Sequence, residues 1–351
     1  MDDITLLNEL VSIYSPTGSE KEAAQFLCRK MTELGMNAEI DSAGNAVGIC
    51  GSEEKNVDEL LLIGHIDTVP GKIDVKIQDG LLYGRGSVDA KGPLAAFVCA
   101  AASFAGQDRL RIRVVGAVDE EGDSIGARRI LKAAMPSYAI VGEPGGWDSV
   151  VIGYKSKISF KYSFIAEMKH AAGAHDNATD SCIAFIYNLR DYIGKLERDS
   201  PFESPQITVR RFNSSDDHFH TIAEAIIDFR TPPGFDADAL IQCAKNHCGA
   251  GKLEILENTP PVLVDKNNVL VRSFLSAIRE SHGKPSFKKK TGTSDMNLLR
   301  EAWDVPMVTY GPGDSSLDHT PNEHIDLGEY LKSITVLKGV IKKIIDKQPV
   351  K

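Results

Sequence analysis

The sequence predicts an α/β protein built on a mixed β-sheet, with a second, α+β domain inserted into the first. At 351 residues the chain exceeds one ordinary hydrophobic core. Short apolar runs alternate with helical segments over the first half of the chain, which is typical of α/β proteins. From about Val151 longer alternating runs follow in β-α-β-β-α-β order, which indicates a ferredoxin-like domain. We therefore expect a discontinuous main domain, residues 1–153 and 264–351, and an inserted domain, residues 154–263.

The composition is that of a cytoplasmic globular protein. Hydrophobic residues make up 42% and charged residues 25% of the chain, and no apolar run is long enough to span a membrane. The acidic, polar start of the sequence argues against a secretory signal. Six scattered cysteines without a CxxC pair are expected to be reduced thiols. A net charge of −9 disfavours nucleic acid as a partner.

Periodicity and turn signals predict the elements of the first half. Ser19 and Glu22 form a capping-box pattern at the start of the second helix. Asp79-Gly80 is typical of the turn of a hairpin. The expected helices are 5–14, 19–35, 93–104 and 124–134, and the expected strands are 38–40, 45–50, 60–64, 109–118 and 138–141, with the hairpin at 72–83.

In the second half, residues 150–165 alternate like one long edge strand. The helices expected after it are 177–197, 236–247, 268–281, 295–303 and 327–345, and the strands are 206–212, 222–229, 252–256 and 305–310.

A candidate metal ligand stands at the end of the buried strand 60–64. His65 and Asp67 follow that strand, and alternation places both on one side of the chain. A neutral imidazole is a good zinc ligand, and a neighbouring carboxylate can fix its tautomer. The alternative is a buried histidine with a helpful aspartate beside it.

Acidic residues recur where later strands end. Asp89 lies in a glycine-rich loop before a helix, Glu120 and Glu121 follow the strand 109–118, and Glu143 follows the strand 138–141. The loop lacks both GxGxxG spacing and a GK[ST] sequence, so it is not a nucleotide-binding loop. Because ligands bind beyond the carboxyl ends of strands in open α/β sheets, these positions favour a metal site over solvated acidic loops.

With His319 from a late glycine-rich loop, the set matches what two zinc ions sharing one carboxylate require: two histidines, two terminal carboxylates and a bridge. Glu120 points away from Glu121 if the segment is extended, so it is a candidate general base. Such a site can activate water and polarise a carbonyl, which is the chemistry of amide hydrolysis. A metal-dependent binding protein that has lost activity is the alternative from another class.

The motifs GHIDTVP, GRGSVDAKG, DEEGDSIGA, GEP and HTPNEHI resemble those of the M20 family of dinuclear zinc amidohydrolases and peptidases, in the same order along the chain. The resemblance implies a catalytic domain of the zinc-exopeptidase type and an inserted lid or dimerisation domain, in a homodimer. It implies that Asp89 bridges two metals, zinc or cobalt. One metal would add His65 and Glu143, and the other Glu121 and His319. Asp67 would support a ligand, Glu120 would be the base, and the Asp89-Ala90 peptide would be cis.

Within the family, KKTGTSDMNLL and YGPGDSSLDHTPNEHI look most like the deacylases of lysine biosynthesis, also described as acetyl-lysine deacetylases. These release lysine or ornithine, the latter for arginine biosynthesis, by cutting a linear amide to an acidic amino-group carrier protein. Small-molecule deacetylases for acetylornithine or acetyl-lysine, and dipeptidases of the same family, are the alternatives. The sequence leaves the choice of amino acid and acyl group open.

The resemblance also assigns substrate-side residues. His170 matches the family's oxyanion histidine, with His175 as the alternative. Arg230 matches the Arg of a DxR strand end and is a candidate for binding a carboxylate, unless it pairs with Asp228. Gly292, Thr293 and Ser294 match a GTSD turn that lines the substrate pocket. The basic triplet 288–290 before that turn is either solvated surface or a steering patch for an acidic carrier.

Overall fold

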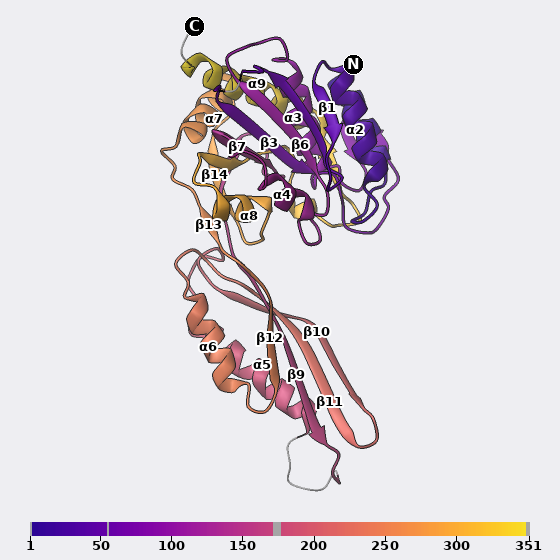
Figure 1. Ribbon diagram of the computed structural model, residues 1–351, viewed down its shortest axis with the longest axis vertical. Coiled ribbons are helices and arrows are strands. Elements are labelled where there is room, and N and C mark those ends of the chain that lie inside the picture. The colour runs from indigo at the N-terminus through magenta and orange to yellow at the C-terminus, as the bar shows by residue number, and fades with distance from the viewer. Residues whose placement is uncertain (1, 55, 171–176, 349–351) are drawn as a thin grey trace. The chain divides into compact units, whose positions relative to one another are not determined.

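The computed structural model describes residues 2–54, 56–170 and 177–348, and the chain divides into two compact units. The main unit comprises Met1–Ile152, Val264–Lys288 and Ser294–Lys351. The inserted unit comprises Gly153–Leu263 and Lys289–Thr293. Both units are shown in Figure 1. None of the described helices is at once long and apolar enough to cross a membrane.

A large mixed sheet forms the centre of the main unit. Its strand order is β1-β2-β6-β3-β7-β15-β8-β13, with β14 beside β8. Strand β3 is parallel to both β6 and β7, and β7 is parallel to β15. The bounds are β1 Asn37–Ile40, β2 Ala46–Gly51, β3 Glu59–His65, β6 Arg111–Ala117, β7 Tyr138–Gly142, β8 Ser149–Tyr154, β13 Val262–Leu263, β14 Ser286–Lys290 and β15 Met307–Thr309. The apolar run of β3 is fully buried, as expected of a central parallel strand.

Helices pack around this sheet. Helix α3 contacts β3, β6, α1 and α9, and α7 also packs on α9 (Figure 1). Helix α3 is buried on almost every side, because other elements surround it. Its alanine-rich sequence suits this position, since small apolar side chains allow close packing all round the helix. The helices are α1 Asp3–Ser12, α2 Lys21–Glu33, α3 Lys91–Ala102, α4 Ile125–Ile130, α7 Val269–Glu280, α8 Asp295–Ala302 and α9 Leu327–Lys347, with a 3-10 turn at Ser315–Leu317. A small separate sheet joins β4 Lys76–Gln78, β5 Leu81–Tyr83 and β16 His324–Asp326.

The inserted unit has the β-α-β-β-α-β element order that the sequence predicts. Its antiparallel sheet has the order β10-β11-β9-β12, and α5 packs on that sheet and on α6 (Figure 1). The elements are β9 Lys157–Glu167, α5 Ala178–Gly194, β10 Gln206–Asp216, β11 His220–Arg230, α6 Ala237–His247 and β12 Lys252–Thr259. Phe185 of α5 stacks on Tyr162 of β9, with ring centroids 3.9 Å apart, at the core between helix and sheet.

The single long edge strand expected at residues 150–165 is wrong. The segment forms two strands, β8 and β9, which lie inside two different sheets. They are separated at Lys155 and Ser156, whose backbone amides bond to Lys290 and Thr231 instead of continuing one ladder. Alternation of apolar residues describes both strands equally, so it does not reveal the break between them.

Other elements differ in smaller ways. The capping box at Ser19 is absent, because α2 begins at Lys21 after Glu20 and has no side-chain cap. Strands β14 and β16 were not predicted. The residues of β14, SFKKK, are mostly exposed and basic, and β16 is only three residues long. Both become strands through pairing with distant segments, which local sequence does not specify.

Candidate metal centre

Three adjacent parallel strands deliver four of the predicted site residues to one edge of the main sheet. His65 is the last residue of β3. Glu120 and Glu121 follow β6, and Glu143 follows β7. Because β6 and β7 flank β3 on either side, their carboxyl ends meet at this edge.

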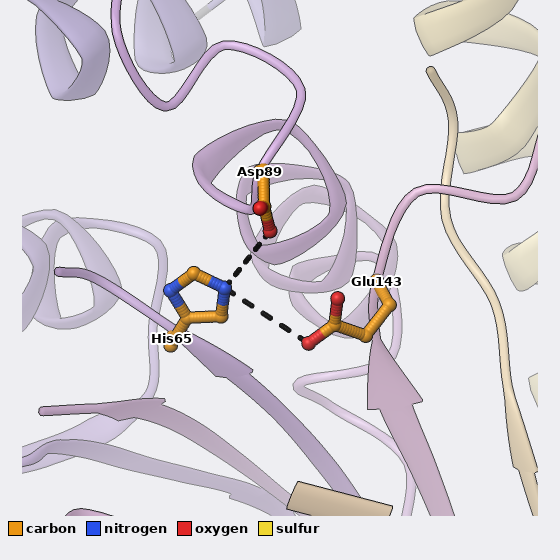
Figure 2. Close-up of side chains that lie close together, drawn as sticks. All are labelled: His65, Asp89 and Glu143. Carbon is orange, nitrogen blue, oxygen red and sulfur yellow. Dashed lines mark hydrogen bonds and ion pairs between the residues drawn. The ribbon is translucent and has the colours of Figure 1, made fainter. Parts of the chain in front are cut away.

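Asp89 completes a first cluster with His65 and Glu143 (Figure 2). It lies just before α3, at the end of a glycine-rich turn, and its side chain faces His65 at the end of β3 (Figure 2). Nε2 of His65 is 3.2 Å from Oδ1 of Asp89 and 3.9 Å from Oε1 of Glu143. The peptide bond between Asp89 and Ala90 is cis, as the resemblance implied.

A second cluster contains Asp89, Glu121 and His319. Nε2 of His319 lies 3.0 Å from Oδ2 of Asp89 and 2.8 Å from Oε1 of Glu121. The two oxygens of Asp89 therefore face different histidines, Oδ1 towards His65 and Oδ2 towards His319. The carboxylate of Asp89 thus belongs to both clusters of possible metal ligands.

Asp67 holds the parts of the site together without facing the clusters. Nδ1 of His65 donates to the backbone oxygen of Asp67 at 2.9 Å, which leaves Nε2 directed at Asp89. The Asp67 carboxylate accepts the backbone amides of Glu120 and Glu121, both at 3.1 Å, and the hydroxyl of Thr17 at 2.9 Å. Burial opposes its charge, but these hydrogen bonds and His65 lower the pKa of Asp67.

Glu120 and Glu121 lie in a turn, so the segment is not extended and the condition under which Glu120 would point away from Glu121 is not met. His65, Glu120 and Glu121 also form a group of possible ligands, and both glutamates therefore face the same region. Burial, and then the charges of Glu143, Asp295 and Glu121, raise the pKa of Glu120 well above its usual value, against the effect of His65. A buried carboxylate with high proton affinity is suited to receive a proton.

The donor set fits divalent cations. Four carboxylates and two imidazoles converge here, and so many acidic groups repel one another unless positive charge lies among them. Hydrogen bonds that His319 Nε2 donates to the carboxylates of Asp89 and Glu121 raise the pKa of His319 to about 10. The geometry therefore favours positive charge at the position of His319, and nitrogen and carboxylate donors are the ligands that zinc prefers.

The substrate-side candidates of the inserted unit lie at strand ends. His170 follows β9 and is exposed, whereas His175 lies outside the described residues. Nη1 of Arg230, at the end of β11, donates to Oγ1 of Thr293 at 2.8 Å. The carboxylate of Asp228 instead accepts from Ser159 at 2.5 Å and pairs with Arg210 at 3.4 Å.

Gly292 is exposed, and Ser294 is the N-cap of α8 in a capping box with Asn297. The GTSD motif thus spans the end of a connecting segment and the start of a helix.

Two residues near the clusters were not singled out from the sequence. Asp295, the last residue of GTSD, is 3% exposed, and burial raises its pKa to about 6. Glu323, in the NEHI part of the last motif, is fully buried and bonds to the Asp89 segment. Both residues belong to sequence motifs that resemble those of the family, which could have drawn attention to them. A single acidic residue in a polar segment does not, however, indicate that its side chain is buried.

Comparison with known proteins identifies the family. The model of peptidase family M20/M25/M40 matches residues 61–343. The chain belongs to this family. A LysW-lysine hydrolase of Deinococcus radiodurans is 39% identical over 97% of this chain and 96% of its own. A LysW-lysine/LysW-ornithine hydrolase of Saccharolobus islandicus is 32% identical over 97% of this chain and 96% of its own.

Solved structures of the M20 family share the fold. The M20 metallo-carboxypeptidase Sso-CP2 of Sulfolobus solfataricus superposes with a TM-score of 0.79 at 20% identity, covering 99% of this chain and 100% of its own. Aminopeptidase PepT of Bacillus cereus gives a TM-score of 0.79 at 19% identity and 98% coverage of both chains. The mixed-sheet α/β architecture predicted from the sequence is confirmed by this agreement.

Proposed function

We propose that this M20 protein is a metal-dependent amidohydrolase that releases lysine, ornithine or both from a LysW-type carrier protein in the cytoplasm. The observation that carries the chemistry is Asp89, whose two carboxylate oxygens face His65 and His319 separately. The substrate assignment rests on the names of relatives that match nearly the whole chain.

Asp89 would be shared by two cations. His65 and Glu143 would complete one position, and Glu121 and His319 the other. Zinc is the ion best suited to these donors, and cobalt accepts similar ones. Bound cations supply Lewis acidity, which polarises the amide carbonyl and makes water more acidic.

Glu120 is the proton carrier in this proposal. Its carboxylate takes a proton from the attacking water while the hydroxyl oxygen bonds to the acyl carbon. As the carbon–nitrogen bond breaks, Glu120 returns the proton to the departing amine. Asp67 keeps Glu120 in place, since it binds the Glu120 backbone amide. His170 would donate to the oxyanion that forms on the acyl oxygen.

Arg230 and the GTSD turn would bind the released amino acid. A guanidinium binds a carboxylate through two parallel hydrogen bonds, which suits the free carboxylate of lysine or ornithine. Arg230 is already oriented by Thr293, so its fork is partly fixed before a substrate arrives. Gly292 and Ser294 would provide backbone and hydroxyl contacts beside it.

Turnover of two substrates distinguishes a carrier hydrolase from a small-molecule deacetylase. Zinc-loaded protein would be incubated with a carrier-lysine conjugate and with Nα-acetyl-lysine, and released lysine would be quantified. We expect kcat/KM to be at least about 100-fold higher for the conjugate, since extended substrate contacts are used in catalysis. Equal or higher kcat/KM for acetyl-lysine would contradict the carrier assignment.

The basic triplet Lys288–Lys290 provides a further arm of this experiment. Lys288 and Lys289 are exposed in β14, so they can meet an acidic partner. Changing all three lysines to Ala should raise KM for the carrier conjugate at low salt and leave KM for acetyl-lysine unchanged. An unchanged KM for both substrates would remove the steering role.

We also propose a homodimer formed through the inserted unit. Helix α5 exposes Ile183 (52%) and Tyr187 (68%), and the edge strand β10 exposes Phe212 (38%). Within the described part of the chain β10 is the outermost strand of its sheet, and exposed apolar side chains on a helix and on such a strand are typical of a contact surface. A second copy is the partner that this surface fits best, because no described strand pairs with the outer edge of β10 and the same edge of another copy can pair with it.

The oligomeric state tests this surface. The double variant Ile183→Asp/Tyr187→Asp should be a monomer by sedimentation equilibrium at a concentration where the unmodified protein is a dimer. Ile255→Asp, which adds a charge at the similarly exposed β12 edge, is the matched control and should remain a dimer. A monomeric unmodified protein, or a dimeric double variant, would contradict the proposal.

A further inference from the structure

Glu323 is a fully buried carboxylate whose hydrogen bonds all converge on one segment. Its Oε1 accepts the backbone amides of Val88 at 2.9 Å and of Asp89 at 3.1 Å. Its Oε2 pairs with Nη1 of Arg85 at 2.9 Å, and the two side chains are 1% and 6% exposed. Removing a carboxylate from water is costly unless such donors compensate it, so this arrangement is specific.

The donors of Glu323 belong to the segment that presents Asp89. Arg85 is itself fixed, because its Nε donates to the backbone oxygen of Gly71 at 3.0 Å. With two consecutive amides and the guanidinium bound, the backbone leading into the Asp89 side chain has little freedom. The position of that carboxylate is therefore set partly by a residue more than two hundred positions later in the chain.

Glu323 also lies on the segment that presents His319. It directly precedes β16, which pairs antiparallel with β5. The backbone oxygen of Glu323 accepts a hydrogen bond from the amide of Gly84, the residue directly after β5, at 3.3 Å. The strand pairing and the side chain thus join the two loops that carry Asp89 and His319.

We propose that Glu323 is a positioning residue that joins the two loops of the metal centre and holds Asp89 where it can face both histidines. The proposal rests on the two-cation centre proposed above. His65 is the last residue of β3 and Glu143 directly follows β7, so the sheet holds both without help from Glu323. Asp89 and His319 stand on loops, and they depend on the contact between those loops.

This difference gives the proposal a specific signature. Loss of Glu323 should weaken the cation position formed by Asp89, Glu121 and His319 more than the position formed by His65, Asp89 and Glu143. Metal coordination tolerates only small errors in ligand placement, so a modest loop shift is enough. Substitution of a residue that orients a ligand typically lowers metal affinity about 10- to 100-fold.

The test is titration of Zn²⁺ into metal-free protein, followed by calorimetry and by competition with a chromophoric chelator. Glu323→Ala should lower the affinity of one of two sites about 10- to 100-fold and leave the other within about threefold. Glu323→Gln keeps an acceptor for the two amides but loses the charge pair with Arg85, so a smaller loss is expected. Circular dichroism of the metal-free proteins verifies folding, and Glu323→Gln alone carries the test if Glu323→Ala does not fold.

Glu59→Gln is the matched control. Glu59 pairs with the largely buried Arg113 at the opposite end of β3, so its loss removes a comparable ion pair away from the metal centre. This variant should melt at a lower temperature and bind two ions with unchanged affinity. Two sites of unaltered affinity in the Glu323 variants would overturn the positioning role. An unmodified protein that binds a single ion would instead overturn the two-cation centre, and the positioning role with it.

Discussion

Glu120→Gln is expected to reduce kcat by about 10²- to 10⁴-fold while leaving both metal positions intact. In free-energy terms this raises the activation barrier by about 3–5 kcal/mol. The reason is that glutamine has nearly the same shape but cannot accept and return a proton. The backbone amide of residue 120 would still bind Asp67, so the turn should keep its structure. Steady-state kinetics and zinc content per chain, measured on the same preparation, provide the comparison.

Asp123→Asn is the matched control for this variant. Asp123 belongs to the same turn but is exposed, so its amide counterpart should turn over substrate within about twofold of the unmodified protein. A Glu120→Gln variant with nearly normal kcat would rule out Glu120 as the base. A variant that lost zinc together with activity would indicate that Glu120 is a ligand, as its place in a group with His65 and Glu121 allows.

Asp89→Asn is expected to abolish measurable turnover by removing the charge shared between the two positions. Asparagine has a single side-chain oxygen, which is neutral. It can therefore serve as a cation ligand beside His65 or beside His319, but not beside both. Metal content should therefore fall from about two ions per chain to one or fewer. Elemental analysis after gel filtration measures this loss directly.

Chelation gives the corresponding result for the unmodified protein. Ligands that bind only the folded state stabilise it, so removal of tightly held ions should lower the melting temperature by several degrees. The Asp89→Asn variant should show little further change with chelator. Asp79→Asn, on the exposed β4–β5 turn, is the control and should match the unmodified protein in ion content and melting temperature. Full ion content in Asp89→Asn would refute the shared role of Asp89.

Much of the site could be predicted because the order of elements alone places strand ends at one edge. Once β3, β6 and β7 are parallel neighbours, His65, Glu121 and Glu143 have to meet. Asp89 and His319 were less determined by that logic, since both stand on loops whose paths depend on distant contacts. Both residues were predicted from the order of the family's motifs along the chain. The structure brings them into one cluster with Glu121.

The parts that could not be predicted depend on pairing between remote segments. Nothing local in Ser286–Lys290 indicates a strand, and nothing in the 150–165 run marks the boundary between two sheets. Glu323 is a similar case, because its function follows from burial against residues 85–89 and not from its neighbours in sequence. An acidic residue within a polar motif is equally compatible with solvent exposure.

The pairing of β16 with β5 has a consequence for cotranslational folding. Strands β3, β6 and β7, with their acidic ends, are synthesised early, whereas β15, His319 and β16 emerge only near the end of translation. For about half of synthesis, between Glu143 and His319, a nascent chain therefore carries mutually repelling carboxylates without the last histidine of the cluster. Acquisition of the proposed cations should be among the last events of biogenesis, and a stalled or shortened chain would be left with an acidic, incomplete sheet edge that is open to misassembly.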